Sequence, residues 1–316
     1  MIRTVIVPPK QLCIYNNDYY KETYSFLERL NSAVFNRKEL VVVDLQKVEV
    51  ITAAASVLLF ATINTCQLSY KNPNQVICKY PTSSNNPNGY RYIVKTGLSR
   101  ALNAGTLSAL DDLKNNAVFF QSATDPNRHL LTTLQLLTNK TKFNPIQLHY
   151  LMTGISEAML NVVHHAYKDP FDDDCIHMKK QLIVKEIGER WWQCAWYDSA
   201  QNAWIFIICD LGLGIPSTYN YLRQTELYSS NPDLALRDAF VRGNSRFVGS
   251  GRGNGSEDMV KPIRNGCKES LLVYSGGAKL LYHSSMESVK VQRLDRFFNG
   301  TLVEWKLYVE QEGELQ

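Results

Sequence analysis

Three short strings in the second half of the chain constrain its fold more than any other feature. They occur in the order EAMLNVVHHA at 157–166, DLGLGI at 210–215 and GSGRGNG at 249–255. In the first string Glu157, Asn161 and His165 are spaced four residues apart, so a helix presents all three side chains on one stripe. The other two strings are glycine-rich loops. A helix that carries a carboxylate and an amide, followed by two such loops, predicts a nucleotide site.

The composition is that of an ordinary globular protein, with 45% hydrophobic and 20% charged residues. At 316 residues, the length predicts about two domains. A net charge of +4 is small for this length, and no run of Lys or Arg resembles a basic arm. We therefore expect no nucleic-acid partner.

Cysteine usage and hydropathy bear on where the protein works. The seven cysteines are widely spaced and form no CxxC pair, which favours reduced thiols over a disulfide framework or a zinc site. The N-terminal residues lack the apolar run of a signal peptide, and the longest apolar stretch, around 53–61, is too short to cross a bilayer. These patterns predict a cytoplasmic protein with no membrane segment.

The first hundred residues alternate between strand and helix patterns. Strands are expected at 4–7, 39–43 and 75–80, and helices at 19–34, from Ala53 onward and from about Tyr92 to Gly105. This alternation predicts an α/β domain at 1–108, with helices packed on a sheet. We assign 109–143 to a linker or connecting helix. A helix is expected there at 128–137, and a linker or an extra strand before it.

A second domain is expected at 144–316. Its first helix begins at Pro145, a residue suited to a helix N-terminus, and continues to about Val162. The remaining elements expected are strands at 182–187, 191–197, 204–209 and 301–309, a helix at 258–265, and a hairpin through Ser275–Gly276–Gly277.

Each string has a plainer explanation when taken singly. Glu157 and Asn161 fit a solvated helix face, and 249–255 fits a flexible linker. Two other glycine motifs are absent from the sequence. It contains no GxxxxGK[ST] string, and neither glycine run completes GxGxxG after a strand within a βαβ unit. The order and spacing of the three strings favour the joint interpretation.

Residues 144–309 resemble the GHKL ATPase superfamily, which includes gyrase-type ATPases, Hsp90-like chaperones, histidine kinases and the MutL group. EAMLNVVHHA is similar to the ExxxNxxxHA box, DLGLGI to the DxGxG box and GRGNG to the second glycine box. FNGTLVEWKL is similar to the closing Gly-Thr strand, through Gly300 and Thr301. By motif, the chain is most similar to the anti-sigma-factor serine kinases. The resemblance implies the Bergerat ATP-binding fold, an α+β two-layer sandwich.

The resemblance implies that the chain binds ATP with Mg²⁺. Asn161 would supply an amide oxygen to Mg²⁺, a hard cation that prefers oxygen ligands. Asp210 would accept a hydrogen bond from the adenine amino group, with Thr301 beside it. Gly212 and Gly214 would let the backbone pass close under the base, where a side chain would clash.

The resemblance also implies a set of phosphate contacts. Gly251, Gly253 and Gly255 would bring backbone N–H groups and the N-terminus of the next helix to the phosphates, in a loop that also holds Arg252 and Asn254. Residues from Ile215 to Gly249 would form a lid over the nucleotide. Arg242 and Arg246 in that lid are candidate phosphate contacts or solvated charges. His165 would position phosphate or pack the helix.

Glu157 separates the subclasses of this superfamily. Histidine kinases usually have Asn at this position, whereas ATP-hydrolysing and serine-kinase members have Glu, a carboxylate that can take a proton from water or from a hydroxyl. No phosphoacceptor-histidine helix is visible upstream, because His129 lacks the usual acidic and Arg-Thr-Pro neighbours. We therefore expect a catalytic role for Glu157 and disfavour autophosphorylation on histidine.

Residues 41–61, VVVDLQKVEVITAAASVLLFA, are similar to the STAS domain pattern. In anti-sigma antagonists of that fold a phosphorylatable Ser follows an Asp at a helix start. Here Thr52 falls on the Asp position and Ala53 on the Ser position, so the acceptor hydroxyl is missing. The resemblance implies a docking or regulatory module. The alternative is a structural α/β domain with a similar pattern.

Taken together, these features predict a bacterial regulatory protein with ATPase or serine/threonine protein kinase activity of the anti-sigma type. Its partner would be a separate STAS protein, a sigma-like regulator or an effector, and both a monomer and a homodimer are open. The alternative is a non-catalytic switch that binds nucleotide and grips a partner. A gyrase- or MutL-like machine fits less well, because a transducer domain would be expected after residue 309.

Overall fold

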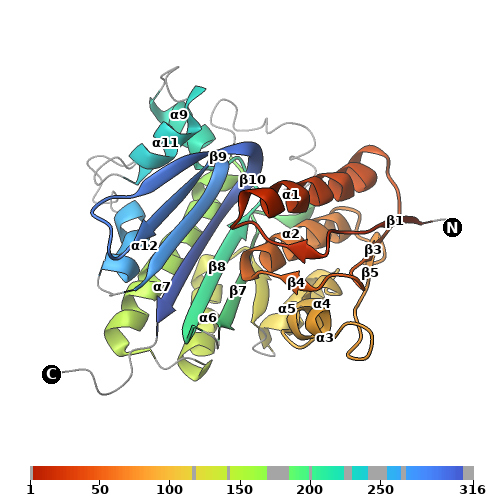
Figure 1. The fold of residues 1–316 in the computed structure, drawn as a ribbon. Helices are drawn as coiled ribbons and strands as arrows, with labels where there is room; N and C mark the ends of the chain where they lie inside the picture. Colours follow the sequence, from red (N-terminus) through yellow and green to blue (C-terminus); the bar gives the residue numbers. More distant parts are fainter. Residues whose placement is uncertain are drawn as a thin grey trace. The chain divides into compact units, whose positions relative to one another are not determined.

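The computed structural model describes residues 3–115, 119–140, 143–168, 185–198, 201–223, 230–240, 255–264 and 268–308. It shows a mixed α/β fold with parallel and antiparallel sheets, as the sequence predicts (Figure 1). The chain divides into two compact units. The first comprises Met1–Ser122, Leu182–Gly188 and Trp192–Cys194, and the second comprises Ala123–Gln181, Glu189–Trp191 and Ala195–Gln316.

The first unit is built on short parallel strands. β1 (Thr4–Ile6), β3 (Val41–Asp44) and β5 (Val76–Lys79) form a sheet in the order β1-β3-β5, and β2 (Gln11–Leu12) pairs with β4 (Val50–Ile51). All three valines of β3 are buried, although successive side chains point to opposite faces. Both faces of this strand are therefore covered, as is usual for parallel sheets.

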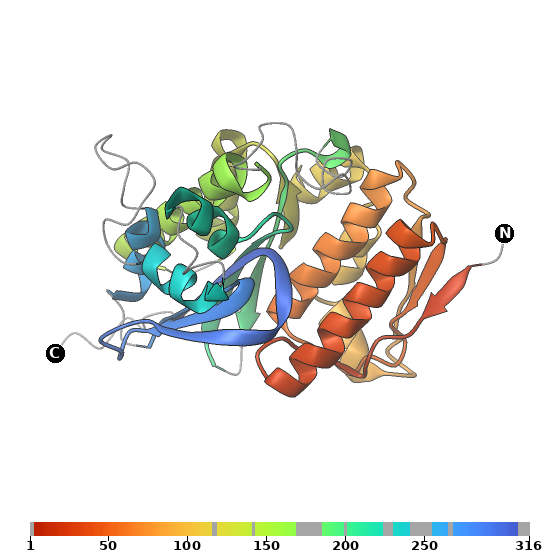
Figure 2. The same ribbon diagram turned by 90° about the horizontal axis from the view of Figure 1, so that it is seen from above.

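Two long helices cover this sheet and lie side by side (Figure 2). α1 (Asn17–Asn31) begins at Asn16, whose side chain accepts a hydrogen bond from the Asp18 N–H and caps the helix. α2 (Ala53–Ser69) has no charged residue, and every residue from Ala53 to Leu68 is buried. A helix that is buried on all faces belongs to a core.

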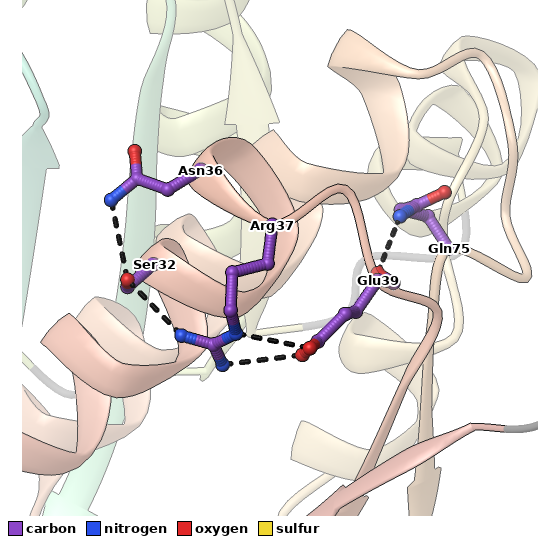
Figure 3. A network of polar contacts seen from close by, with 5 residues as sticks. All are labelled: Ser32, Asn36, Arg37, Glu39 and Gln75. Atoms are coloured by element: carbon purple, nitrogen blue, oxygen red, sulfur yellow. Dashed lines mark hydrogen bonds and ion pairs between the residues drawn. The ribbon is translucent and has the colours of Figure 1, made fainter.

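The chain leaves α1 through a π-helical turn, η1 (Ser32–Asn36), and a polar network ties that turn to β3 and β5 (Figure 3). The Arg37 guanidinium donates to both carboxylate oxygens of Glu39, at 3.0 and 3.2 Å. It also donates to Ser32 Oγ at 3.3 Å. Gln75 Nε2 donates to the Glu39 carbonyl at 2.8 Å. These contacts hold the segment before β3 next to the segment before β5.

The rest of the first unit is mostly helical. It contains α3 (Pro87–Gly89), η2 (Tyr90–Val94), α4 (Leu98–Leu102), α5 (Leu107–Asn115) and most of strand β6 (Phe120–Ala123). β6 is the extra strand considered for the segment before residue 128. Asn64 on α2 donates to the Ala104 carbonyl at 2.8 Å and accepts from Trp192 Nε1 at 2.9 Å. This buried amide joins three segments of the unit.

The second unit contains β8, β10 and β9, three neighbouring strands of a five-stranded sheet in the order β6-β7-β8-β10-β9. The longer strands of this sheet are β7 (Trp191–Asp198), β8 (Ala203–Asp210), β9 (Ser270–His283) and β10 (Lys290–Tyr308). β10 lies between β8 and β9 and is antiparallel to both. The strands predicted at 191–197, 204–209 and 301–309 are therefore confirmed over their described residues.

Helices pack on this sheet (Figures 1 and 2). They are α6 (Pro126–Lys140), α7 (Pro145–Asn161) with the π-helical turn η3 (Val162–Ala166), α9 (Ile215–Arg223), α11 (Pro232–Ala239) and α12 (Gly255–Arg264). α7 and α12 contact each other, and a Cβ at Gly154 would lie 3.2 Å from the Asp258 carbonyl. Trp305 Nε1 donates to the Met259 carbonyl at 2.8 Å, which ties α12 to β10.

Two predicted elements are wrong, and a third is interrupted, because Gly97, with a φ of 85°, divides the helix expected from about Tyr92 to Gly105 into η2 and α4. The hairpin expected at Ser275–Gly277 does not occur, because β9 continues from Ser270 to His283. Phe298 of β10 pairs with Gly276 and the register shifts on both sides of Phe298, so these glycines accompany irregular pairing rather than a turn. The strand expected at 182–187 also fails in its described part. Residues 185–187 are helical, and Gly188 follows with a φ of 74°, a common way for a helix to end.

One further expectation concerns the membrane. Within the described ranges, none of the helices combines the length and the hydropathy that a bilayer span requires.

Candidate functional site

The first part of the site lies on α7. Asn144 caps the helix by accepting a hydrogen bond from the Gln147 N–H at 2.7 Å, and Pro145 occupies the first turn. Glu157 and Asn161 follow one turn apart near the C-terminal end, and both are half-buried. His165 lies beyond them in the π-helical turn η3, where the spacing no longer follows the α-helical repeat. Of the three residues in the predicted stripe, only Glu157 and Asn161 therefore keep the α-helical spacing.

Glu157 faces α12. Its pKa is raised above the ordinary value first by burial and then by the negative charge of Asp258, while a hydrogen bond from Asn161 opposes the rise. Asp258 in turn forms an ion pair with Lys261 at 2.5 Å. A carboxylate with a raised pKa is a stronger base, which suits a group that accepts a proton from water or a hydroxyl.

Asp210 ends β8 and is the second part of the site. Its side chain is buried, with the residue only 5% exposed. Asp210 Oδ1 accepts hydrogen bonds from the Gly212 N–H at 2.8 Å and from the Thr301 N–H at 3.3 Å. The β8–β10 register places Thr301 directly opposite Asp210. Backbone donors from a loop and from a neighbouring strand therefore hold this carboxylate.

The loop after Asp210 has its amide groups turned toward the protein. The Leu211 N–H donates to Tyr167 Oη at 3.2 Å, and the Leu213 N–H donates to the Ala166 carbonyl at 2.6 Å. The Ile215 N–H donates to Ser275 Oγ at 2.7 Å. A loop that cradles phosphate needs its amides directed at the anion. This glycine loop is therefore not built as an anion nest.

Two glycines make this loop conformation attainable. A Cβ at Gly212 would lie 2.0 Å from the Ala166 carbonyl oxygen, far inside van der Waals contact. Gly214 has a φ of 85°, in the left-handed region that side chains disfavour. The sequence predicts a close backbone approach at both positions. In the structure, the atoms that closely approach Gly212 and Gly214 belong to the protein itself, such as the Ala166 carbonyl oxygen next to Gly212.

Hydrogen bonds join the first two predicted motifs to each other and the second to the predicted closing strand. The end of the α7–η3 segment contacts the loop through Ala166 and Leu213, and the loop contacts β10 through Asp210 and Thr301. Gly255 begins α12, the helix that carries Asp258. The other residues predicted to contact phosphate lie outside the described residues: Arg242, Arg246, Gly251, Arg252, Gly253 and Asn254.

The donor chemistry of α7 fits a magnesium ion. Asn161 offers an amide oxygen beside the Glu157 carboxylate, and Mg²⁺ prefers oxygen ligands and retains several waters. Within the part of the chain that the structure describes, no group of three or more His, Cys, Asp or Glu residues could hold a metal ion. A cation bound here would thus need oxygen atoms from water or from a nucleotide as well.

Sequence reasoning missed three residues of this site: Tyr167, Asp258 and Ser275. Tyr167 directly follows the first motif, and Ser275 lies within the stretch expected to be a turn. Asp258 was expected only as part of a helix. Nothing in their residue type marks them, because each acts through a partner far away in sequence.

Two other predicted positions are buried. His129 is 3% exposed and packs edge-on against Trp191, with ring centroids 5.8 Å apart, which agrees with disfavouring it as a phosphoacceptor. Ala53, which the resemblance to the STAS pattern would place at the acceptor serine, begins α2 and is 4% exposed. The hydroxyl of Thr52 before it is buried, and among the described residues it has no hydrogen-bond partner.

Comparisons with known proteins add no family to this description. A scan against models of protein families gives no match, and a search of curated proteins gives no significant match. The function is therefore inferred from the residues and their geometry.

Proposed function

We propose that residues 144–308 bind ATP with Mg²⁺ in a Bergerat-type site, and that the chain is an ATPase or serine/threonine protein kinase of the anti-sigma type. One observation carries the proposal. Asp210 is buried at the end of β8, and the Gly212 and Thr301 N–H groups hold its carboxylate in place. A fixed, buried carboxylate is a selective acceptor for a ligand that offers a hydrogen-bond donor.

The polarity of this acceptor favours the base of a nucleotide over its phosphates. An ionised carboxylate only accepts hydrogen bonds, and it repels anions. Adenine offers an amino group at its C6 position, and guanine offers one at its C2 position. Asp210 therefore suits a nucleobase and not phosphate, and the choice of ATP rests on the resemblance of DLGLGI to the DxGxG box. The N–H groups of Leu211, Leu213 and Ile215 donate to protein oxygen atoms and so offer no cradle for an anion. This also indicates that the base, and not the phosphates, lies next to this loop.

The chemistry would take place on α7. Bound Mg²⁺ would neutralise charge on the transferred phosphoryl group, and Asn161 would help to hold the ion. Glu157, whose pKa is raised by burial and by Asp258, would accept the proton of the attacking water or hydroxyl. Asn161 forms a hydrogen bond with this carboxylate and would thereby orient it.

The phosphoacceptor of a kinase reaction would be a separate protein. The STAS-like stretch has Ala53 at the acceptor position, and this position is 4% exposed. A docking role for the first unit and a hydroxyl on a separate STAS, sigma-like or effector protein are consistent with these features. The same observation favours the alternative, a nucleotide-dependent switch without turnover.

Titration of ATP into the full chain with Mg²⁺ present, followed by calorimetry, tests the binding proposal. Asp210→Asn keeps the size of the side chain and an oxygen for the two backbone donors but replaces an acceptor with a donor. We expect ATP affinity to fall roughly tenfold or more. Wild-type protein that binds no ATP would overturn the proposal.

Asp125→Asn is the matched control. Its Oδ1 also accepts two backbone N–H groups, from Asn127 at 3.0 Å and from Arg128 at 3.3 Å, but at the start of α6. ATP affinity should not change in this variant. A comparable loss in both variants would mean that capping of the backbone, and not recognition of the base, explains the effect at Asp210.

Turnover separates the enzyme from the switch. ADP release from ATP, with and without added candidate partner proteins, should depend on Glu157 if the chain is an ATPase or kinase. Glu157→Gln should then retain nucleotide binding and lose turnover by about 10²-fold or more. Binding without turnover in either protein, with partner capture still dependent on ATP, would support the switch.

A further inference from the structure

Two buried hydroxyl groups hold the loop after Asp210, one near each of its ends. Tyr167 Oη accepts the hydrogen bond of the Leu211 N–H, and Ser275 Oγ accepts that of the Ile215 N–H. Neither residue belongs to the loop. Tyr167 follows η3, and Ser275 lies within β9. Side chains from two separate elements therefore determine where the loop lies.

Tyr167 uses both hydrogen-bonding functions of its phenol group. The residue is 3% exposed, and its hydroxyl donates to the Arg190 carbonyl at 2.5 Å while it accepts from Leu211 at 3.2 Å. Burial, and then the charge of Asp210, raises the pKa of Tyr167 well above its ordinary value. The phenol therefore keeps its proton and continues to donate to Arg190.

Ser275 makes a comparable link at the other end. The residue is fully buried, and its Oγ lies 2.7 Å from the Ile215 nitrogen. The same oxygen lies 2.9 Å from Thr301 Oγ1 and 3.3 Å from the Gly300 carbonyl. It thus connects the start of α9 to the part of β10 that faces Asp210.

We propose that Tyr167 and Ser275 are positioning residues for base recognition, which they serve by holding the 211–215 loop and, through it, the Asp210 carboxylate. This inference rests on the proposed function. The connection is the Gly212 N–H, which donates to Asp210 Oδ1 at 2.8 Å from within the loop. If either hydroxyl is removed, the loop gains freedom to move, and this donor moves with it. Neither hydroxyl needs to touch the nucleotide.

Tyr167→Phe and Ser275→Ala test the proposal, because each removes one hydroxyl and little else. In the protein without nucleotide, amide hydrogen exchange in the 211–215 loop should become faster in both variants. Affinity for ATP with Mg²⁺ should fall roughly three- to tenfold, the expected effect of one hydrogen bond. The value of kcat at saturating ATP should not change, because Glu157 is untouched, so the loss appears in KM.

Two matched variants in the first unit serve as controls. Tyr80→Phe also removes a phenolic hydroxyl, whose single proton lies within reach of the Ser99 carbonyl at 3.2 Å and of Asn103 Oδ1 at 2.8 Å. Ser56→Ala also removes a buried serine hydroxyl, which donates to the Thr52 carbonyl at 2.9 Å. These controls should lower the free energy of unfolding without altering loop exchange or ATP affinity.

Each outcome gives a decision. Faster loop exchange together with weaker ATP binding supports the proposal. Unchanged loop exchange, or faster exchange with unchanged ATP affinity, overturns it while the proposed ATP site stands. If the wild-type protein binds no ATP, the proposed function fails and base positioning fails with it. Loop exchange would then still show whether the two hydroxyls anchor the loop.

Discussion

Asp210 and Thr301 lie directly opposite each other on the antiparallel strands β8 and β10, and the Thr301 N–H donates to Asp210 Oδ1 at 3.3 Å. The two residues are 91 positions apart in sequence, yet their relation is set by sheet register. A shift of the register by one residue would turn the side chains of a strand to the other face. The geometry of this site therefore depends on how the surrounding sheet and helices pack.

Gly212→Ala should disrupt the site through sterics alone. Its Cβ would lie 2.0 Å from the Ala166 carbonyl oxygen, so the loop or η3 must move. We expect the free energy of unfolding to fall by about 2–3 kcal/mol, as for other overpacked positions. Urea denaturation measures this loss. At Gly154 a Cβ meets nothing closer than 3.2 Å, so Gly154→Ala should be milder, and equal losses would contradict the steric explanation.

Glu157→Gln should stabilise the protein at neutral pH. The pKa of Glu157 is raised by burial and by Asp258, so the folded state binds this proton more tightly than the unfolded state does. Stability from this group is therefore present at low pH and is lost as pH rises from the unfolded pKa through the raised folded pKa. Gln has no charge to bury, so the gain should be larger at pH 7 than at pH 4 in urea denaturation.

Glu39→Gln provides a control of opposite sign. The hydrogen bond from Arg37 lowers the pKa of Glu39, so its stabilising effect is present above the unfolded pKa and is lost on acidification. This variant should be destabilised at pH 7 and resemble wild type at low pH. If both variants respond to pH in the same direction, the assigned environment of Glu157 is wrong.

Asp258→Asn should change the pH dependence of turnover. The charge of Asp258 is the second cause of the raised pKa of Glu157, after burial. Without that charge, the pKa of Glu157 should fall but remain raised by burial. If Glu157 is the base, the acidic limb of the pH–rate profile should move to lower pH. An acidic limb that stays in place would assign it to another group.

Asn64→Ala should destabilise the first unit. The Asn64 amide is fully buried, donates to the Ala104 carbonyl at 2.8 Å and accepts from Trp192 Nε1 at 2.9 Å. The change leaves two buried polar groups without partners, at a cost of about 2–4 kcal/mol. Tryptophan fluorescence during urea denaturation reports the loss. Asn36→Ala removes an exposed amide and should stay within about 0.5 kcal/mol of wild type.

Most elements could be predicted because their patterns are local. Pro145 and the apolar repeat after it mark α7, and the apolar run from Ala53 marks α2. The two exceptions have different causes. Ser275–Gly276–Gly277 has the composition of a turn, but pairing with β10 keeps it within β9. The strand predicted at 182–187 takes its apolar pattern from residues 182–184, whereas Lys185 and Glu186 are charged, and Gly188 ends a helical turn there.

The sequence by itself determined which residue types were available and in what order. It placed Glu157 and Asn161 one helical turn apart, and it put glycine at 212, where no side chain fits. Only the tertiary structure decided how these residues are held. The Asp258 charge reaches Glu157 because α12 packs on α7, and the hydroxyls of Tyr167 and Ser275 reach the 211–215 loop because η3 and β9 flank it. Periodicity and backbone geometry act over a few residues, whereas hydrogen bonds and charges act between atoms that only folding brings together.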